Sequence, residues 1–366
     1  FPAAASAEGV GVALDAPVEK NKLDALGVYI FAGGFTLGVS QHFNVVAHLE
    51  GGDYGVMTAK NFWPKMPIWQ SVPTWPLKRF AGVPFVYANP PCAIWSVAGS
   101  SMNKGKAQWV SDPRTNCIRN VFKVLREVRP KILVWESVTQ AWTRGRGLVE
   151  QLAKEALAQG YAVTYLFTSA ELHGIPQPRQ RFLMWCHRVA LDLPMPTTVY
   201  RNVADVLGLD MLTGAQDVPV WGEHRMSEDT YRLARATRMD ELVKDAYLDI
   251  DPDGERPPAF MLRRVSAFGR GTTFTSAIME LHPYWNRFLA NSEIAALGGW
   301  PYREEDKDYY HGDDQLVRAQ LCQAVLPPVG EYVGRMARLA LERDERCEPA
   351  LRLVNHIVDE RPYLKL

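Results

Sequence analysis

The sequence has no excess of charge of either sign. Its 366 residues include 41 lysines and arginines and 41 aspartates and glutamates, so the formal net charge is zero. A uniformly basic surface is therefore excluded, and any contact with nucleic acid must depend on a local patch. Long apolar runs are also missing, since no segment approaches the ~20 apolar residues that a membrane-spanning helix needs.

Cysteine is scarce and scattered. The five cysteines include no C-x-x-C pair, which argues against both a disulfide framework and a zinc site. Residues 1–20 lack the basic start and the sustained apolar stretch of a signal peptide, so we expect them to form a flexible tail. These absences predict a soluble protein of a reducing compartment, with no membrane partner and no metal.

Short apolar runs alternate with amphipathic segments through the first half of the chain, which is the pattern of an α/β protein. Strands are expected at residues 26–31, 44–50, 83–88, 131–135, 161–167 and 181–186, and helices at 118–128 and 148–158. We therefore predict a doubly wound, mostly parallel sheet. Ligands of such sheets bind at the carboxyl ends of the strands.

The alternation stops after residue 196, where a segment rich in Arg, Asp and Gly begins. A helical pattern resumes at 292–297 and again at 316–341, where Pro327 and Pro328 interrupt it. The expected divisions are a tail at 1–20, a main domain at 21–190, a smaller irregular domain at 191–285, and a C-terminal segment at 286–366.

Three short motifs bring a thiol, a carboxyl group and two guanidinium groups to predicted strand ends. Cys92 follows Asn89-Pro90-Pro91, Glu136 ends the fourth predicted strand, and Arg179 and Arg181 stand at the start of the last. A pyrimidine ring attacked at C6 needs a sulfur nucleophile, an acid that protonates N3 and fixed positive charge. Taken singly, these residues are more often a buried cysteine, a solvated carboxylate and an exposed turn. Their combination favours a catalytic role.

A glycine turn follows the first predicted strand. Phe31-Ala32-Gly33-Gly34-Phe35 is a weak signal by itself, because such turns are more often structural than cofactor-binding. Glu50 ends the second predicted strand, where a carboxylate suits the hydroxyl groups of a ribose. The tryptophan-rich stretch at 61–75 favours packing over base stacking.

In their order along the chain these motifs resemble those of the DNA (cytosine-5) methyltransferase family. The glycine turn is similar to the cofactor motif, Asn89-Pro90-Pro91-Cys92 to the nucleophile loop, Glu136-Ser137-Val138 to the Glu-Asn-Val motif, and Gln177-Pro178-Arg179-Gln180-Arg181 to the Gln-x-Arg-x-Arg motif. Residues 289–301 and 320–330 resemble the ninth and tenth motifs of the family.

The resemblance implies a Rossmann-like, S-adenosylmethionine-dependent methyltransferase that acts on a cytosine flipped out of double-stranded DNA. Cys92 would add to C6 of the base and Glu136 would bond N3. Arg179 and Arg181 would fix the base and its neighbouring phosphate. Carbon 5 would then accept the methyl group. The biological setting would be a restriction–modification system or a phage.

The resemblance also assigns binding residues and a setting. The cofactor would contact Phe31, Ala32, Gly33, Gly34, Phe35, Glu50, Pro91, Gln323 and Val325, and DNA would contact Gln177, Arg263, Arg264 and Arg270. Residues 191–285 would form the target-recognition domain, and 286–366 would return to the catalytic domain. We expect a monomer in the cytoplasm of a bacterial or phage-infected cell.

Departures from the family pattern gather around the cofactor. Tyr29 occupies the place of an acidic residue, the glycine loop is shorter by two residues, and no acidic residue occurs between 54 and 88. Ala93 and Ser137 replace a glutamine and an asparagine. Cys322-Gln323 replaces the Gly-Asn pair of the tenth motif, and Leu326 is inserted. The hypothesis is a divergent member whose base chemistry is retained and whose cofactor pocket is remodelled.

Two other classes stay open. Asn89-Pro90-Pro91 is also similar to the Asn-Pro-Pro-aromatic motif of DNA amino-methyltransferases, which methylate N4 of cytosine or N6 of adenine. Cys92 stands where those enzymes have an aromatic residue. The third class is a non-catalytic DNA-binding relative, which the shortened glycine loop supports and the Cys92, Glu136, Arg179 and Arg181 set opposes.

Overall fold

A computed structural model describes residues 22–51, 55–92, 94–95, 112–213, 227–239, 263–271, 273–275, 280–301 and 304–357. The predicted tail at residues 1–20 lies outside the described residues. Within the described ranges, no helix combines the length and the hydrophobicity needed to cross a bilayer.

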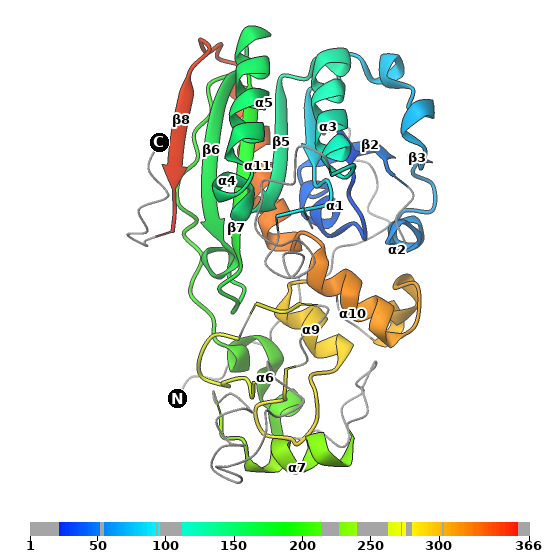
Figure 1. Cartoon of the computed structure of the whole chain (residues 1–366), viewed down its shortest axis with the longest axis vertical. Helices are drawn as coiled ribbons and strands as arrows, with labels where there is room; N and C mark the ends of the chain where they lie inside the picture. The colour runs from blue at the N-terminus through cyan, green and yellow to red at the C-terminus, as the bar shows by residue number, and fades with distance from the viewer. Residues whose placement is uncertain are drawn as a thin grey trace.

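One sheet organises the upper part of the molecule (Figure 1). Its strands are β1 (Leu23–Val28), β2 (Phe43–Leu49), β3 (Ile68–Trp69), β4 (Phe85–Ala88), β5 (Ile132–Val138), β6 (Ala162–Ser169), β7 (Gln180–His187) and β8 (Leu351–Asn355). They lie in the order β3-β2-β1-β4-β5-β7-β6-β8. All neighbours pair in parallel except β7, which runs antiparallel to both β5 and β6. The predicted mostly parallel α/β sheet is confirmed.

The direction of β7 matters for the site. Because β7 is antiparallel, its first residues meet the carboxyl ends of its neighbours, and Arg181 pairs with Val138 at the end of β5. If β7 were parallel to its neighbours, its first residues would lie at the opposite edge of the sheet from their carboxyl ends. Residues from β4, β5 and β7 therefore reach one edge of the sheet.

Helices cover the sheet and extend below it. They are α1 (Gly34–Val39), α2 (Val56–Phe62), α3 (Thr115–Val128), α4 (Gln140–Thr143), α5 (Arg146–Ala158), α6 (Val203–Thr213), α7 (Glu228–Ala236), α9 (Asn291–Leu297), α10 (Asp314–Gln323) and α11 (Pro327–Arg343). Short 3₁₀ turns are η1 (Val72–Thr74), η2 (Leu77–Phe80), η5 (Ala170–His173) and η6 (Glu304–Tyr309). Figure 1 shows α3 and α5 in front of the sheet and α11 behind it.

The core has two layers, one on each face of the sheet. Successive residues of a strand point to opposite faces, so Leu133 and Trp135 pack under α3 and α5, whereas Ile132 and Val134 pack under α1 and α11. α3 contributes a stripe of buried residues at helical spacing, from Ile118 to Val128. Both faces being covered explains the near-continuous apolar character of β5.

Helices α1 and α11 are in very close contact. A Cβ atom on Gly38 would lie 2.1 Å from the backbone nitrogen of Glu331, and one on Gly330 would lie 2.6 Å from the carbonyl oxygen of Phe35. Only residues without a side chain allow the two backbones to approach this closely. The C-terminal helix is thereby fixed to the first helix of the sheet.

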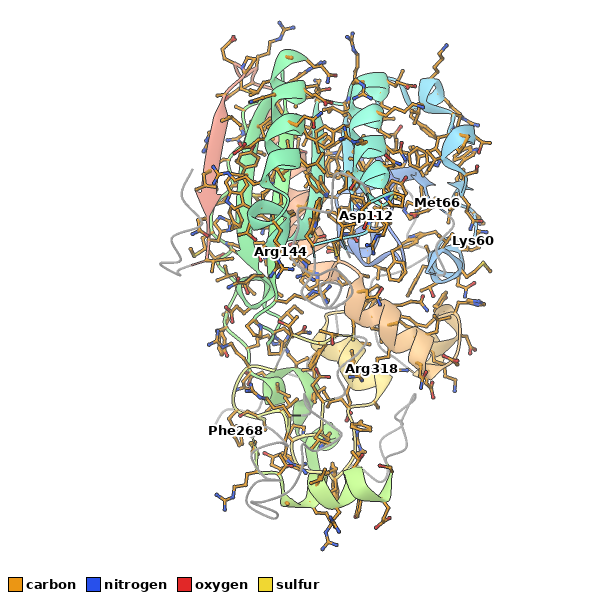
Figure 2. All side chains as sticks on the ribbon, in the orientation of Figure 1. Lys60, Met66, Asp112, Arg144, Phe268 and Arg318 are labelled. Carbon is orange, nitrogen blue, oxygen red and sulfur yellow. The ribbon has the colours of Figure 1, made fainter. Side chains whose placement is uncertain are left out.

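The lower part of the molecule holds α6 and α7 at the far end, with α9 and α10 between them and the sheet (Figure 1). A third apolar cluster joins α9 and α10 to the glycine turn through Ala32 and Leu37. Arg318, labelled on α10 in Figure 2, forms a buried ion pair with Glu280 at 2.8 Å. The C-terminal segment therefore contacts both the sheet and the irregular segment at 191–285.

Several element boundaries differ from the sequence expectations. β5 extends three residues beyond the expected strand end at 135, so Glu136 lies inside the strand. The interrupted helix predicted at 316–341 is a pair of helices, α10 and α11, because Pro327 and Pro328 begin a new helix. The edge strand β8 was not predicted, since its exposed residues lack an apolar run.

Candidate active site

The ends of β4 and β5 bring the thiol loop to the carboxyl group. Ala88 pairs with Trp135 in the sheet, so the next residues along, Asn89 and Glu136, lie side by side. Asn89 donates a hydrogen bond from Nδ2 to Oε2 of Glu136 at 2.5 Å. The loop that carries Cys92 is therefore tied at its first residue to the predicted acid.

Glu136 is buried, with 2% of its surface exposed, and faces a cation. Arg181 Nε lies 2.8 Å from Oε1 of Glu136. Arg181 is therefore a direct partner of this oxygen, and its hydrogen bond favours the ionised carboxylate. Burial raises the pKa of Glu136, while the charges of Arg181 and Arg179 and the bond from Asn89 act in the opposite direction.

Cys92 is half-buried and packs against the apolar cluster under α3. Burial is the main cause that raises the pKa of its thiol, and the negative charge of Glu136 adds to this effect. The positive charges of Arg181 and Arg179 oppose it. The thiol of Cys92, the carboxyl group of Glu136 and the two guanidinium groups thus influence one another electrostatically.

The nucleophile loop is anchored on its far side as well. The indole Nε1 of buried Trp95 donates to Oγ of Ser137 at 3.2 Å, and the backbone nitrogen of Trp95 donates to the carbonyl oxygen of Cys92 at 3.1 Å. Ser137 stands where the related family has an asparagine. In this chain its hydroxyl group accepts the bond that holds the loop.

Arg179 is engaged with backbone. Its guanidinium group, 3% exposed, donates to the carbonyl oxygens of Cys322, Gln323 and Ala324 at 2.5, 3.2 and 2.7 Å. Burial, and then the neighbouring Arg181, lowers the pKa of Arg179 to about 9, which leaves it charged at neutral pH. Its hydrogen bonds therefore order the end of α10.

The glycine turn after β1 has an unusual backbone. Tyr29 and Phe31 adopt positive φ angles of 55° and 60°, and Gly33 has φ of 92°. Glu50, which is 1% exposed at the end of β2, accepts a hydrogen bond from the backbone nitrogen of Ile30 at 2.7 Å. Positive φ angles at two non-glycine residues are uncommon and signal a strained turn.

The space beside the two glycines is occupied by the chain itself. A Cβ on Gly33 would lie 2.5 Å from the ring of Trp63, and one on Gly34 would lie 2.1 Å from the carbonyl oxygen of Val325 and 2.7 Å from Trp300. Two tryptophan rings thus flank the shortened turn. The lack of side chains at Gly33 and Gly34 thus lets these rings and the Val325 carbonyl group approach the turn.

The remaining predicted cofactor residues are spread around this turn. Ala32 and Phe35 are buried in the clusters beneath α9 and α11, and Val325 is buried beside Gly34. Gln323 is exposed at the end of α10, and Pro91 is half-buried in the nucleophile loop.

The predicted DNA-binding residues occupy different environments. Gln177 is buried and bridges two segments, with Nε2 donating to the carbonyl oxygen of Leu297 at 2.9 Å and Oε1 accepting from the nitrogen of Phe274 at 3.4 Å. Arg270 is exposed and pairs with Glu171 at 2.7 Å. Arg263 is partly exposed and stands at the start of the segment 263–271, which also contains Arg270.

Arg264 serves the interior of the lower part. Its guanidinium group is 5% exposed and donates to the carbonyl oxygens of Ala234, Thr237, His282 and Trp285 and to Oδ1 of Asn286, at 2.5 to 2.8 Å. Five donors used in this way hold α7 against the segment at 280–288. This guanidinium group therefore supports the fold of the lower part of the molecule.

Sequence reasoning missed several contributors to the site. Asn89 was read only as part of the loop motif, although neighbouring strand ends in the predicted order would have placed it beside Glu136. Trp95 carried no signal, and Trp63 and Trp300 were separated from the glycine turn by too many residues for a spacing argument. Their positions depend on tertiary packing.

The chain matches a family model described as C-5 cytosine-specific DNA methylase over residues 29–337. It is 23% identical over 262 residues to the type II methyltransferase M1.HphI of Haemophilus parahaemolyticus, covering 69% of this chain and 67% of that protein. It is 25% identical over 378 aligned positions to the type II methyltransferase M.XorII of Xanthomonas oryzae, covering 87% and 85% of the two proteins.

The fold has a solved counterpart. The structure of an Escherichia coli prophage protein, described as a DNA modification methyltransferase, aligns with a TM-score of 0.66 at 16% sequence identity. The alignment covers 87% of this chain and 99% of the other. Because the likeness extends over nearly the whole of that chain, the sheet and the lower part of the molecule follow one shared architecture.

Proposed function

The chain belongs to the family of C-5 cytosine-specific DNA methylases, and from this premise we propose that Cys92, Glu136 and Arg181 carry out methylation of carbon 5 of cytosine. Transfer of a methyl group to cytosine in DNA is the reaction of the family. The observation that supports the residue assignment is the buried Glu136 carboxyl group, which Asn89 Nδ2 and Arg181 Nε hold at the end of β5, beside the loop that carries Cys92.

Cys92 acts as the nucleophile. Its thiol gives its proton to solvent, and its sulfur forms a bond to C6 of a flipped cytosine while the C5=C6 π bond breaks and its electron pair moves toward C5 and N3. Burial raises the pKa of Cys92, and the positive charges of Arg181 and Arg179 act in the opposite direction, toward the thiolate that attacks. Asn89 and Trp95 hold the loop on both sides of the sulfur.

Glu136 acts as the acid for N3. Because burial raises its pKa, the carboxyl group retains a proton more readily than an exposed glutamate. Transfer of this proton to N3 neutralises the electron density that arrives when the sulfur bond forms. C5 can then accept the methyl group. The C5 proton leaves to solvent, the C5=C6 bond re-forms with expulsion of the Cys92 thiolate, and N3 returns its proton to Glu136, which completes the cycle.

Methyltransferases of this family use S-adenosylmethionine, which supplies an electrophilic methyl group. The residues beside the glycine turn fit its nucleoside end, since the buried Glu50 carboxyl group directly follows β2 and Phe31 stands in the turn after β1. Trp63 and Trp300 lie against Gly33 and Gly34. We propose that these rings shape the methionine end of a remodelled donor site.

Double-stranded DNA is the expected substrate, with residues 191–285 as the target-recognition domain. The 176–178 loop is bonded to this domain, because the nitrogen of Gly271 donates to the carbonyl oxygen of Pro176 at 2.7 Å. Arg270 and Arg263 are the candidates for DNA contact. Gln177 positions the loop between the sheet and this domain.

The proposal is tested with DNA that contains 5-fluorocytosine. Fluorine at C5 blocks the final elimination, so a C5 enzyme with S-adenosylmethionine stays covalently bound to the DNA, and a denaturing gel detects the adduct. Cys92→Ser should abolish the adduct. Cys117→Ser is the matched control, because Cys117 is a half-buried thiol on α3 that the proposal does not use.

Two results would contradict the assignment. An adduct that survives Cys92→Ser would make another thiol the nucleophile. Methylation without any adduct would favour attack by an exocyclic nitrogen, as in the amino-methyltransferases. Calorimetric titration with S-adenosylmethionine tests the remodelled donor site separately, since an affinity ordinary for the family would contradict remodelling.

A further inference from the structure

The turn between α10 and α11 lies between the two halves of the proposed site. On one side, the guanidinium group of Arg179 donates to the carbonyl oxygens of residues 322–324 at 2.5, 3.2 and 2.7 Å. On the other side, the carbonyl oxygen of Val325 is so close to Gly34 that a Cβ there would be 2.1 Å away. The same short turn therefore contacts the glycine turn and the segment that leads into β7.

Charge and burial strengthen the hydrogen bonds from Arg179 to the end of α10. The last carbonyl groups of a helix have no donors within the helix and carry the negative end of its dipole. Arg179 is almost fully buried, so a charged, planar fork meets these carbonyls where water does not compete. The end of α10 and the position of Arg179 are consequently fixed together.

Arg179 is also linked to the base site by sequence. It stands two residues before Arg181 and directly before β7 begins, and its carbonyl oxygen accepts a hydrogen bond from the backbone nitrogen of Ala170 at 3.0 Å, which continues the pairing of β6 with β7. Arg181 Nε lies 2.8 Å from Oε1 of Glu136. A displacement of the 322–325 turn would therefore move the start of β7 and alter the ion pair at Glu136.

On the basis of the proposed function, in which Gly34 and Val325 border the donor site, we infer that Arg179 is a positioning residue that couples the donor site to the base site. A donor bound against the 322–325 turn fixes Arg179, and through the start of β7 it fixes Arg181 against Glu136. By linkage, a bound base would strengthen donor binding by the same factor. A purely structural cap would stabilise the fold and leave the two sites independent.

The experiment uses the full chain with S-adenosylhomocysteine as the probe and Cys92 as the reporter, so no target DNA sequence is needed. The rate of Cys92 alkylation by iodoacetamide is measured against pH, with peptide-resolved mass spectrometry to separate the cysteines. The charged groups that act on Cys92 are Glu136, Arg181 and Arg179. Any rearrangement of these groups shifts the apparent pKa of the thiol.

In the wild type, saturating S-adenosylhomocysteine should change the Cys92 alkylation rate by on the order of fivefold, the lower end of common coupling energies, with a matching shift in its pH profile. Arg179→Lys keeps a positive charge and loses the planar fork. This variant should still bind S-adenosylhomocysteine within a few-fold of the wild type by calorimetry. Saturating S-adenosylhomocysteine should change the rate of Cys92 alkylation in this variant by less than twofold.

Arg188 offers a matched control. It lies just beyond the other end of β7, and its Nη2 donates to the carbonyl oxygen of Gln159 at the end of α5, at 3.0 Å. Like Arg179→Lys, Arg188→Lys removes the planar guanidinium group from an arginine that donates to the end of a helix beside β7. It should leave the response of Cys92 to S-adenosylhomocysteine as large as in the wild type.

The outcomes separate the coupling from the proposed function. An equal response in wild type and Arg179→Lys overturns the coupling, as does a wild type that binds the probe with no response at Cys92. Failure of the wild type to bind S-adenosylhomocysteine overturns the donor part of the proposed function. Hydrogen exchange on the wild type tests the coupling without a variant, because the probe should slow exchange at 177–182 as well as 322–326. Protection confined to 322–326 would refute it.

Discussion

Replacing Glu136 by glutamine tests the central chemistry. Glutamine has the shape of glutamate, so its amide oxygen can still accept the bond from Asn89 Nδ2. The amide can neither donate an acidic proton to N3 nor pair with the charge of Arg181. Glu136→Gln therefore removes the proton and the ion pair while the β5 backbone and the loop position are retained.

The magnitude follows from the two lost roles. Loss of a positioned general acid lowers the rate about 10²- to 10⁴-fold, which corresponds to roughly 3–5 kcal/mol of barrier. The ion pair is mostly buried, with the Arg181 side chain 14% exposed and that of Glu136 3% exposed. Leaving Arg181 without its partner should lower the free energy of unfolding by about 1–3 kcal/mol.

The assay is single-turnover transfer of a labelled methyl group from S-adenosylmethionine to unmethylated DNA of high sequence complexity, with DNA affinity measured in parallel. Glu150→Gln is the control, because Glu150 forms an exposed ion pair with Arg146 on α5, and such pairs contribute less than about 1 kcal/mol. The reasoning is refuted if Glu136→Gln transfers methyl groups within about threefold of both the wild type and the control.

Three further outcomes are expected. Glu136→Gln should shift the alkylation profile of Cys92 to lower pH, because the carboxylate charge raises the pKa of that thiol; an unchanged or upward shift would contradict this. Gly34→Ala should lower the free energy of unfolding by at least about 1–3 kcal/mol by overpacking, since its Cβ would lie 2.1 Å from the carbonyl oxygen of Val325. A denaturation midpoint equal to that of the wild type would count against the packing. Arg264→Ala should lower the free energy of unfolding by several kcal/mol, because five hydrogen bonds of the buried guanidinium group are lost. A loss of DNA affinity with unchanged thermal unfolding would instead make Arg264 a DNA contact.

Much of the fold was predictable because the strands are short, apolar and separated by helical patterns. The antiparallel direction of β7 was not, although the sequence placed Arg181 at its start. No local pattern distinguishes a parallel from an antiparallel strand when both faces are buried. The edge strand β8 was missed because its side chains are mostly exposed.

For the site, sequence motifs brought Cys92, Glu136 and the arginine pair together, and the structure places them near one edge of the sheet. The motifs treated Arg179 and Arg181 alike. Their environments differ because residues 322–324, more than 140 positions along the chain, accept the hydrogen bonds of Arg179 alone. Likewise, the burial of Arg264 depends on α7 and the 282–286 segment, whose positions no local pattern gives.

The contact between α1 and α11 has a consequence for how the chain acquires its structure. His42 and Glu331 are bonded across 289 residues, and the Phe35 and Val39 side chains of α1 pack in one apolar cluster with residues of α11. Contacts between such distant residues close late and slow folding. During translation the first strands would expose their apolar surface, so fragments that end before residue 327 should depend on chaperones and aggregate when produced alone.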